Sequence, residues 1–339
     1  MTATNAAAVI NAVSDCSTLP GNPAGGIAKP RTIIYDDSSG SIMTALGEDP
    51  INTLGFADAV CLSSDGTDNY FNRGYAVLNG KGITSANAST KLKPVMIHEF
   101  GHMLGLDHSQ INLDCLNDPG CPGLEGLPTM FPVLVDGAAM STPATDDVAG
   151  ISELYPGTTF APSTGTITGH VFFSDGQTPA EAYNVIARQV GNPLVVAVSN
   201  VSGALFTSDA GNPFVQSAAL GTPSPFGSRD QSLIGFYRLP GLPPGNYTVE
   251  VEAINGSGGA AFVLGSGVGP IGSFLGFQFP LASLLPTPPC AQEYLVSGST
   301  ATCSSAGATT ISVSGGQVVS TGTDIILIGT PPGSDAWED

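Results

Sequence analysis

Three of the four histidines in this chain lie between His98 and His108, in the pattern H-E-x-x-H-x-x-G-x-x-H. On an α-helix His98 and His102 are one turn apart and project from the same face, so that both imidazoles can reach one metal ion. Gly105 lets the chain leave the helix in a conformation that a side chain would resist, and this exit brings His108 back as a third ligand. Three protein ligands leave a fourth position open for water, which is the arrangement of a catalytic zinc site.

Glu99 follows the first histidine, so its carboxylate is rotated away from the ligand face but is close enough to hold a water at the open position. Zinc lowers the pKa of such a water from ~15.7 toward ~7, and a carboxylate beside it can act as general base. Two alternatives stand beside this prediction. The pattern can arise by chance on an amphipathic helix, or the site can bind zinc without catalysis, against which the intact Glu99 argues.

A second helix is predicted downstream, between Thr142 and Gly157. Thr142 can cap it and Pro143 suits its first position, while Asp146 and Asp147 lie near the positive end of the helix dipole. Apolar residues predict one buried face, made of Val148, Ile151, Leu154 and Tyr155.

Residues 70–157 resemble the matrixin branch of the metzincin zinc proteases. The resemblance rests on the strand-like segment 74–79, the lead-in 92–97, the histidine pattern, the segment 127–132 with its methionine, and the Asp-Asp helix. It implies that His98, His102 and His108 bind zinc, that Glu99 is the general base, that Met130 lies in the methionine turn beneath the metal, and that Asp146 and Asp147 are structural.

The chain departs from that family in three respects. The connection between His108 and Met130 is longer than in compact members and carries Cys115 and Cys121. Phe131 stands where other metzincin branches have a tyrosine, so no tyrosine ligand is expected there. No Pro-Arg-Cys-Gly segment occurs, so the sequence shows no cysteine-based latency.

The composition favours an exported, acidic protein that acts on protein or peptide substrates. Nine basic residues against 28 acidic ones give a net charge of −19, which would repel nucleic acid and disfavours anionic membranes. No apolar run approaches the roughly 20 residues of a membrane span. Residues 1–5 lack the basic start of a signal peptide, so either the chain is trimmed or its export uses a signal not present here. We favour a trimmed chain that is secreted or located at the cell surface.

Six cysteines can be paired by neighbourhood as Cys115–Cys121, Cys290–Cys303 and Cys16–Cys61. Other connectivities and free buried thiols remain open. The acidic segment 36–40 is predicted to be a solvated turn; Ca²⁺ is possible there, but no complete calcium-binding pattern supports it.

The amino-terminal region predicts a helix over residues 5–13 and a buried strand over 31–36. The strand at 74–78 is expected to offer an edge to an extended peptide substrate.

A segment rich in Gly, Pro, Ser and Thr at 158–164 predicts a linker between domain 1–157 and domain 165–332. Short β-like runs follow it, and segment 236–249 resembles the carboxypeptidase-regulatory-like, transthyretin-like β-sandwich modules. Residues 254–309 are expected to be a Gly/Pro-rich insertion or a small third unit. The predicted fold class is multidomain α+β: a metzincin-type domain followed by a β-sandwich.

The sequence therefore predicts a secreted zinc endopeptidase. One rival hypothesis is a surface adhesion or binding protein whose metzincin domain is a relic. The other is a binding module within residues 165–330, with the protease as processing machinery. The oligomeric state is not indicated.

Overall fold

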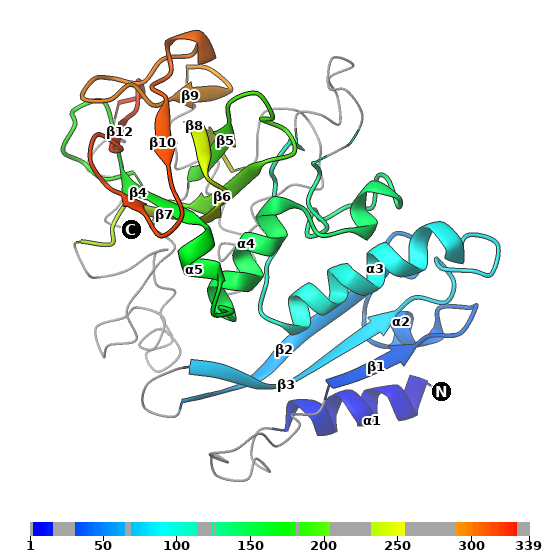
Figure 1. Cartoon of the computed structure of the whole chain (residues 1–339). Helices are drawn as coiled ribbons and strands as arrows, with labels where there is room; N and C mark the ends of the chain where they lie inside the picture. The colour runs from blue at the N-terminus through cyan, green and yellow to red at the C-terminus, as the bar shows by residue number, and fades with distance from the viewer. Residues whose placement is uncertain are drawn as a thin grey trace. The chain divides into compact units, whose positions relative to one another are not determined.

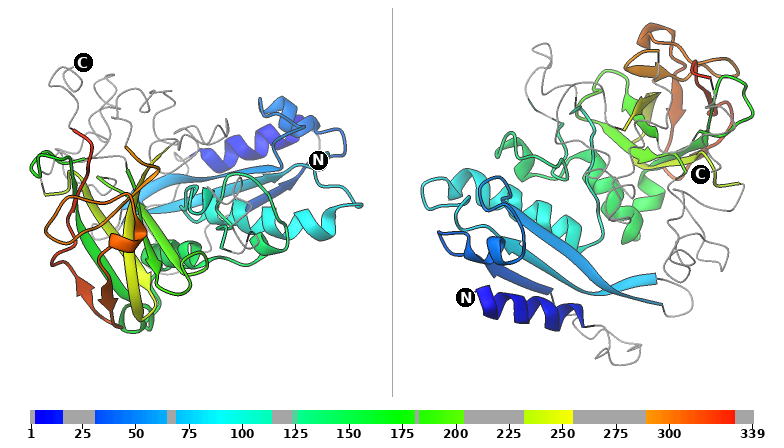
Figure 2. Two further views of the ribbon diagram at one scale, coloured as in Figure 1. Left: turned by 90° about the horizontal axis from the view of Figure 1, so that it is seen from above. Right: turned by 180° about the vertical axis from the view of Figure 1, so that it is seen from behind.

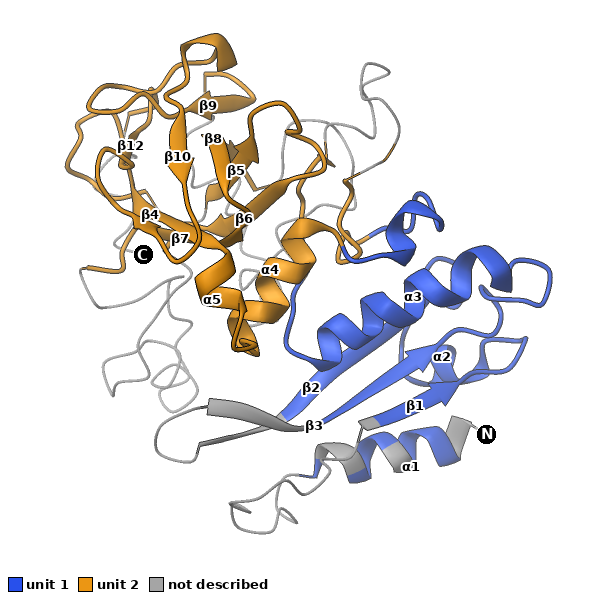
Figure 3. Cartoon of the chain, viewed as in Figure 1, with its two compact units in different colours: residues 1–107, 133–143 blue, residues 108–132, 144–339 orange. Residues whose placement is uncertain are grey.

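The structure is a computed structural model that describes residues 3–15, 31–64, 69–113, 124, 126–180, 183–203, 232–254 and 289–330. Its mixture of helices and several sheets agrees with a multidomain α+β protein. The chain forms two compact units: unit 1 comprises residues 1–107 and 133–143, and unit 2 comprises residues 108–132 and 144–339 (Figure 3). No helix in the described part of the chain has the length and apolar character needed to cross a membrane.

Unit 1 contains a three-stranded sheet in the order β1-β3-β2. Strand β3 (Asn69–Leu78) lies in the centre, parallel to β1 (Arg31–Tyr35) and antiparallel to β2 (Gly55–Ser64). The expectation that segment 74–78 offers an edge is therefore wrong, because its backbone is paired on both sides. The outer strands of the described sheet are β1 and β2.

Helices cover both faces of this sheet: α1 (Ala3–Ser14) lies on one side and α3 (Ala88–Met103) on the other (Figures 1 and 2). The core on the α1 side is formed by Ala6, Ile10, Ile34, Ile42, Met43 and Val77. Burial of these apolar side chains is the main force that holds the layers together.

The acidic segment 36–40 leads into the short helix α2 (Ser41–Ala45). Asp36 accepts hydrogen bonds from the backbone N–H groups of Ile42 at 2.9 Å and Met43 at 3.0 Å. Asp37 accepts hydrogen bonds from the hydroxyls of Ser39 and Ser41, which holds the pKa of its carboxyl well below the usual range. These carboxylates therefore bind the start of a helix, as Asp does in capped turns.

Unit 2 contains two sheets. The first has the order β10-β8-β5-β6, with β9 also paired to β8; the strands are β5 (Tyr183–Gln189), β6 (Ala197–Val201), β8 (Gly245–Ala253), β9 (Gln292–Tyr294) and β10 (Ile311–Val313). The second joins β4 (Gly165–Phe172) to β7 (Phe236–Leu242), β11 (Val318–Val319) and β12 (Ile325–Ile326). Two short helices belong to the same unit, α4 (Thr145–Leu154) and α5 (Phe160–Ser163).

Both sheets of unit 2 contribute to one hydrophobic core. Val185 and Val249 enter it from the first sheet, and Val171, Tyr237 and Leu239 enter it from the second; all five are fully buried. Tyr247, Val249 and Val251 are buried at alternate positions along β8, which is the period-two pattern of a strand.

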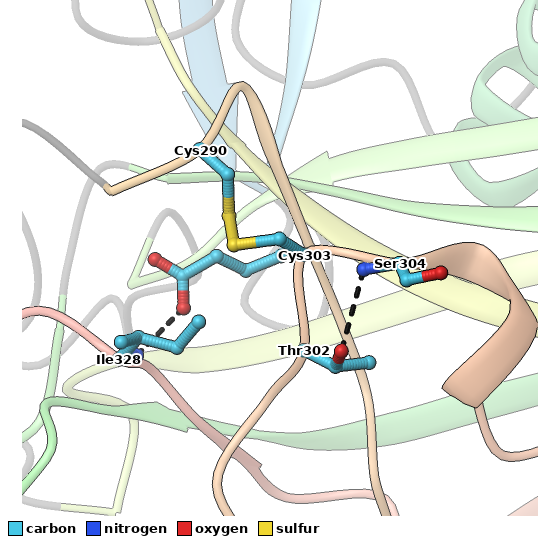
Figure 4. Close-up of a disulfide and its surroundings, with 6 residues drawn as sticks. Cys290, Thr302, Cys303, Ser304 and Ile328 are labelled. Atoms are coloured by element: carbon cyan, nitrogen blue, oxygen red, sulfur yellow. Dashed lines mark hydrogen bonds between the residues drawn. A yellow bond between two sulfur atoms is a disulfide. The ribbon is translucent and has the colours of Figure 1, made fainter.

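The described part of the expected insertion 254–309 is tied to this unit. Strand β9 pairs antiparallel with β8, and a disulfide joins Cys290 to Cys303 (Figure 4). The predicted disulfide between Cys290 and Cys303 is therefore confirmed. Cys16, Cys115 and Cys121 lie outside the described residues, so the pairings that involve them stay predictions.

Helix α4 differs from its prediction in two ways. It begins at Thr145 rather than after Thr142, because the Asp147 carboxylate accepts the N–H of Ala144 at 2.7 Å and so satisfies the helix start. The expected apolar face is largely exposed: Val148 is 48%, Leu154 50% and Tyr155 51% exposed.

The buried residues of α4 are Asp147 and Ala149. Gly241 of β7 permits this close packing, since a Cβ at that glycine would lie 2.8 Å from the Ala149 Cβ. Small residues thus let the helix approach the strand. Unit 2 includes α4 and residues 108–132. The domain border expected at residue 157 stays a proposal.

Candidate metal site

Helix α3 presents His98 and His102 side by side, as the i, i+4 spacing predicts. Their Nε2 atoms are 3.1 Å apart, and their rings meet nearly edge to face with centroids 4.7 Å apart. Two nitrogens bound tetrahedrally to one zinc ion at ~2.1 Å lie about 3.4 Å from each other. The two imidazoles are therefore already close to the separation that a shared ion requires.

The helix ends in a turn that redirects the chain toward the third histidine. Gly105 has a φ of 96°, in the left-handed region that favours glycine. The N–H of Gly105 donates to the His102 carbonyl at 2.9 Å and that of Leu106 donates to the Gly101 carbonyl at 2.9 Å, which is a Schellman motif. The expected helix exit at Gly105 is thus present.

One ring nitrogen from each of His98, His102 and His108 lies within 4.8 Å of the others. The three come from eleven consecutive residues, so the helix and its terminal turn determine their proximity. All three rings are half-buried, which leaves access from solvent. This group could hold a metal ion.

The protonation of His102 suits a ligand. Its Nδ1 lies 2.9 Å from the Leu106 carbonyl, which accepts only from a protonated nitrogen, so the lone pair is on Nε2 beside His98. Burial lowers the pKa of His102, an effect opposed by the Leu106 hydrogen bond and the nearby Asp107 and Asp58. The neutral imidazole that a metal needs is therefore favoured.

Glu99 is only 3% exposed, and its Oε2 has no hydrogen-bond partner among the described residues. Burial raises the pKa of this carboxyl to about 8. A buried polar atom without a partner is uncommon and calls for an explanation such as a catalytic role or a bound ion or water. Three imidazoles beside a carboxylate of this kind fit a zinc ion that keeps an open position.

Gly55 of β2 makes room for Glu99. A Cβ added at Gly55 would lie 2.6 Å from Glu99 Oε1, so a side chain there would displace the carboxylate. Sequence reasoning missed this residue because a glycine at the start of a strand looks like an ordinary turn residue.

Met130 is 3% exposed and lies in a turn that Asp147 holds. The Asp147 carboxylate accepts the N–H of Thr129 at 2.7 Å and that of Met130 at 3.0 Å. Burial raises the Asp147 pKa, while these backbone hydrogen bonds lower it. The Met130 carbonyl accepts the N–H of Ser109 at 3.0 Å, which joins the turn to the residue after the third histidine.

Asp146 points to different partners from Asp147. It accepts the hydroxyl of Ser109 at 2.5 Å and the N–H of Ser199, on β6, at 2.7 Å. Burial raises the pKa of Asp146 to about 6, although these hydrogen bonds oppose the shift. The two adjacent carboxylates therefore hold the methionine turn and the post-histidine segment separately.

The sequence pattern of the family described as Matrixin matches residues 47–118. The match covers β2, β3, α3 and all three histidines. A search of curated proteins finds no match. The matched region supports a metzincin-like, zinc-metalloprotease-like function.

Proposed function

We propose that this protein is a secreted zinc endopeptidase in which His98, His102 and His108 hold the ion and Glu99 is the general base. The observation that carries the proposal is the pairing of three clustered imidazoles with a buried carboxylate whose Oε2 has no partner among the described residues. A structural zinc site would have four protein ligands and no need for such a group.

Zinc bound by the three histidines would supply Lewis acidity and lower the pKa of a water at its open position. Glu99 would take a proton from the attacking water and deliver it to the leaving amine. The Leu106 carbonyl would keep His102 in the tautomer that leaves Nε2 free to bind.

Strand β2 is the best candidate for holding an extended substrate. It pairs with β3 along one side and is an outer strand in the order β1-β3-β2 of the described sheet. An outer strand offers backbone N–H and C=O groups with which a peptide can pair. Gly55, at the start of this strand, lies against Glu99, so a peptide held along β2 would run toward the general base.

The proposal also assigns roles to the rest of the chain. We assign Met130, Asp146 and Asp147 structural roles, and residues 165–332 to a β-sandwich of the carboxypeptidase-regulatory-like type that follows a protease domain, residues 1–157. The disulfide and the net charge of −19 favour a secreted protein.

Substitution of Glu99 tests the proposal. Glu99→Ala should retain zinc but lose peptide hydrolysis by several orders of magnitude, because the ligands stay and the base is gone. Glu153→Ala removes an exposed glutamate of α4 and serves as the matched control. Zinc content by mass spectrometry and cleavage of a peptide library, with and without a chelator, are the measurements.

Unchanged turnover in Glu99→Ala would remove Glu99 from the mechanism. A wild-type chain that binds one zinc equivalent but cleaves no peptide would favour the relic hypothesis instead. His102→Ala should lose the ion itself, since two imidazoles hold zinc poorly.

A further inference from the structure

The four residues that directly follow the third histidine are buried although three of them are polar. Ser109 is 9%, Gln110 1%, Ile111 1% and Asn112 4% exposed. Buried Ser, Gln and Asn side chains need hydrogen-bond partners. The partners of these side chains come from unit 2, to which the four residues themselves belong.

The first two residues are held by side chains of unit 2. Ser109 donates to Asp146, whose other oxygen accepts the N–H of Ser199 on β6. The Gln110 amide donates to Glu252 of β8 at 2.7 Å and to the Ala253 carbonyl at 3.2 Å. Asn184 of β5 donates to the same oxygen of Glu252 at 2.8 Å, so this carboxylate accepts from two amides at once.

Ile111 and Asn112 also contact unit 2, through packing and hydrogen bonds. Ile111 packs with Ile186 and Ala197, on β5 and β6. Asn112 has a φ of 61° and donates from its amide to the carbonyls of Leu194 and Gly126, both at 2.9 Å. Its amide oxygen accepts from Arg188 at 2.6 Å, and Arg188 is fixed in turn by an ion pair with Glu250 at 2.6 Å.

We propose that strands β5, β6 and β8 are part of the metal-binding apparatus, because they fix residues 109–112 and thereby place the His108 imidazole. Glu252 and Arg188 are positioning residues in this scheme. The inference rests on the proposed metal site but assigns unit 2 a role beyond that of an accessory module.

The chemistry of the contacts favours positioning over plain stabilisation. Apolar residues of similar volume would hold a segment against a sheet at least as tightly as a buried ionic network does. Hydrogen bonds to Glu252 and Asn112 add direction, which fixes the backbone next to His108. Groups that orient metal ligands typically change metal affinity 10–100-fold when they are removed.

Glu252→Ala in the full chain tests the inference, and Glu252→Gln is the matched control because its amide oxygen can still accept from both amides. Co²⁺ and Zn²⁺ affinities would be measured by competition with a chromophoric chelator, well below the melting temperature, together with the visible absorption spectrum of bound Co²⁺. We expect about tenfold weaker binding and an altered spectrum in Glu252→Ala. Glu252→Gln should restore both.

Asn112→Gly provides a second variant in case Glu252→Ala does not fold. Glycine tolerates the positive φ but loses the three hydrogen bonds of the asparagine side chain, so metal binding should again weaken about tenfold. Ser312→Ala, which removes an exposed hydroxyl that donates to Asn246, should leave metal binding unchanged.

Wild-type affinity and spectrum in folded Glu252→Ala and Asn112→Gly would overturn the inference, as would a wild-type chain that binds neither ion. Metal binding that responds to these substitutions in a chain that cleaves no peptide would refute the proposed function and leave the positioning role intact.

Discussion

Two buried glutamates show how differently the two units use the same side chain. Glu99 in unit 1 and Glu250 in unit 2 are each 3% exposed. Glu250 accepts from Arg188 at 2.6 Å, whereas Glu99 Oε2 has no partner among the described residues. A paired carboxylate secures architecture, whereas a buried carboxylate without a partner calls for an explanation, such as the catalytic role proposed for Glu99. The difference lies in the surroundings, since both residues lie on regular secondary structure.

The largest effect should come from breaking the paired glutamate. Glu250→Ala leaves the Arg188 guanidinium buried without its counter-ion, which should lower the free energy of unfolding by about 3–5 kcal/mol. Glu99→Gln removes no ion pair and should cost far less. Urea unfolding of both variants measures the contrast, and equal losses would refute the distinction between the two carboxylates.

The disulfide offers a second way to separate the two regions. Cys290 and Cys303 close a loop of 13 residues in unit 2. Replacing both by alanine should lower the free energy of unfolding by about 3 kcal/mol through a less restricted unfolded chain. Zinc affinity measured below the melting temperature should not change. A loss of zinc binding in the folded double variant would show that the cross-link also supports the metal site.

The pH dependence of stability should distinguish Glu252 from exposed carboxylates. Burial raises its pKa to about 7 from a usual value near 4.5. Below pH 4.5 Glu252 is protonated in the folded and in the unfolded chain, so its full contribution to the free energy of unfolding is present there. Between about pH 4.5 and 7 the unfolded chain releases the proton first, so stability falls as pH rises.

Glu252→Gln should remove this pH dependence, so the free energy of unfolding should fall less between pH 4.5 and 8 than in the wild type, by on the order of 2 kcal/mol. Parallel unfolding curves of wild type and variant across that range are the measurement. Profiles of identical slope would mean that Glu252 titrates normally.

The smallest effect is expected at the helix exit of unit 1. Gly105 has a φ of 96°, so Gly105→Ala should cost about 1 kcal/mol from backbone strain. The turn carries the chain to His108, so zinc affinity should fall several-fold. Gly157→Ala is a suitable control, because a Cβ at Gly157 would meet nothing within 4 Å. An alanine at 105 that leaves affinity and stability unchanged would argue that the turn does not need glycine.

Much of the local structure could be predicted from the sequence. The metal helix, its exit at Gly105 and most strands of unit 2 follow from spacing, turn chemistry and period-two alternation, which depend on neighbours along the chain. The Cys290–Cys303 pair was predictable for the same reason, since its partners are close in sequence. Predictions failed where the answer depended on distant residues. The apolar residues of α4 proved exposed because the helix instead packs Ala149 against Gly241 and binds the Met130 turn through Asp147.

The sequence by itself determined which side chains can reach a metal ion, because His98, His102 and His108 are related by one helix and one turn. Only the tertiary structure decided that β3 is central, with β1 and β2 as the outer strands, and that Gly55 leaves room for Glu99. It also decided that residues 109–112 are anchored by strands more than 70 residues further along the chain. Such pairings are set by the combined burial of distant segments, and no local pattern encodes them.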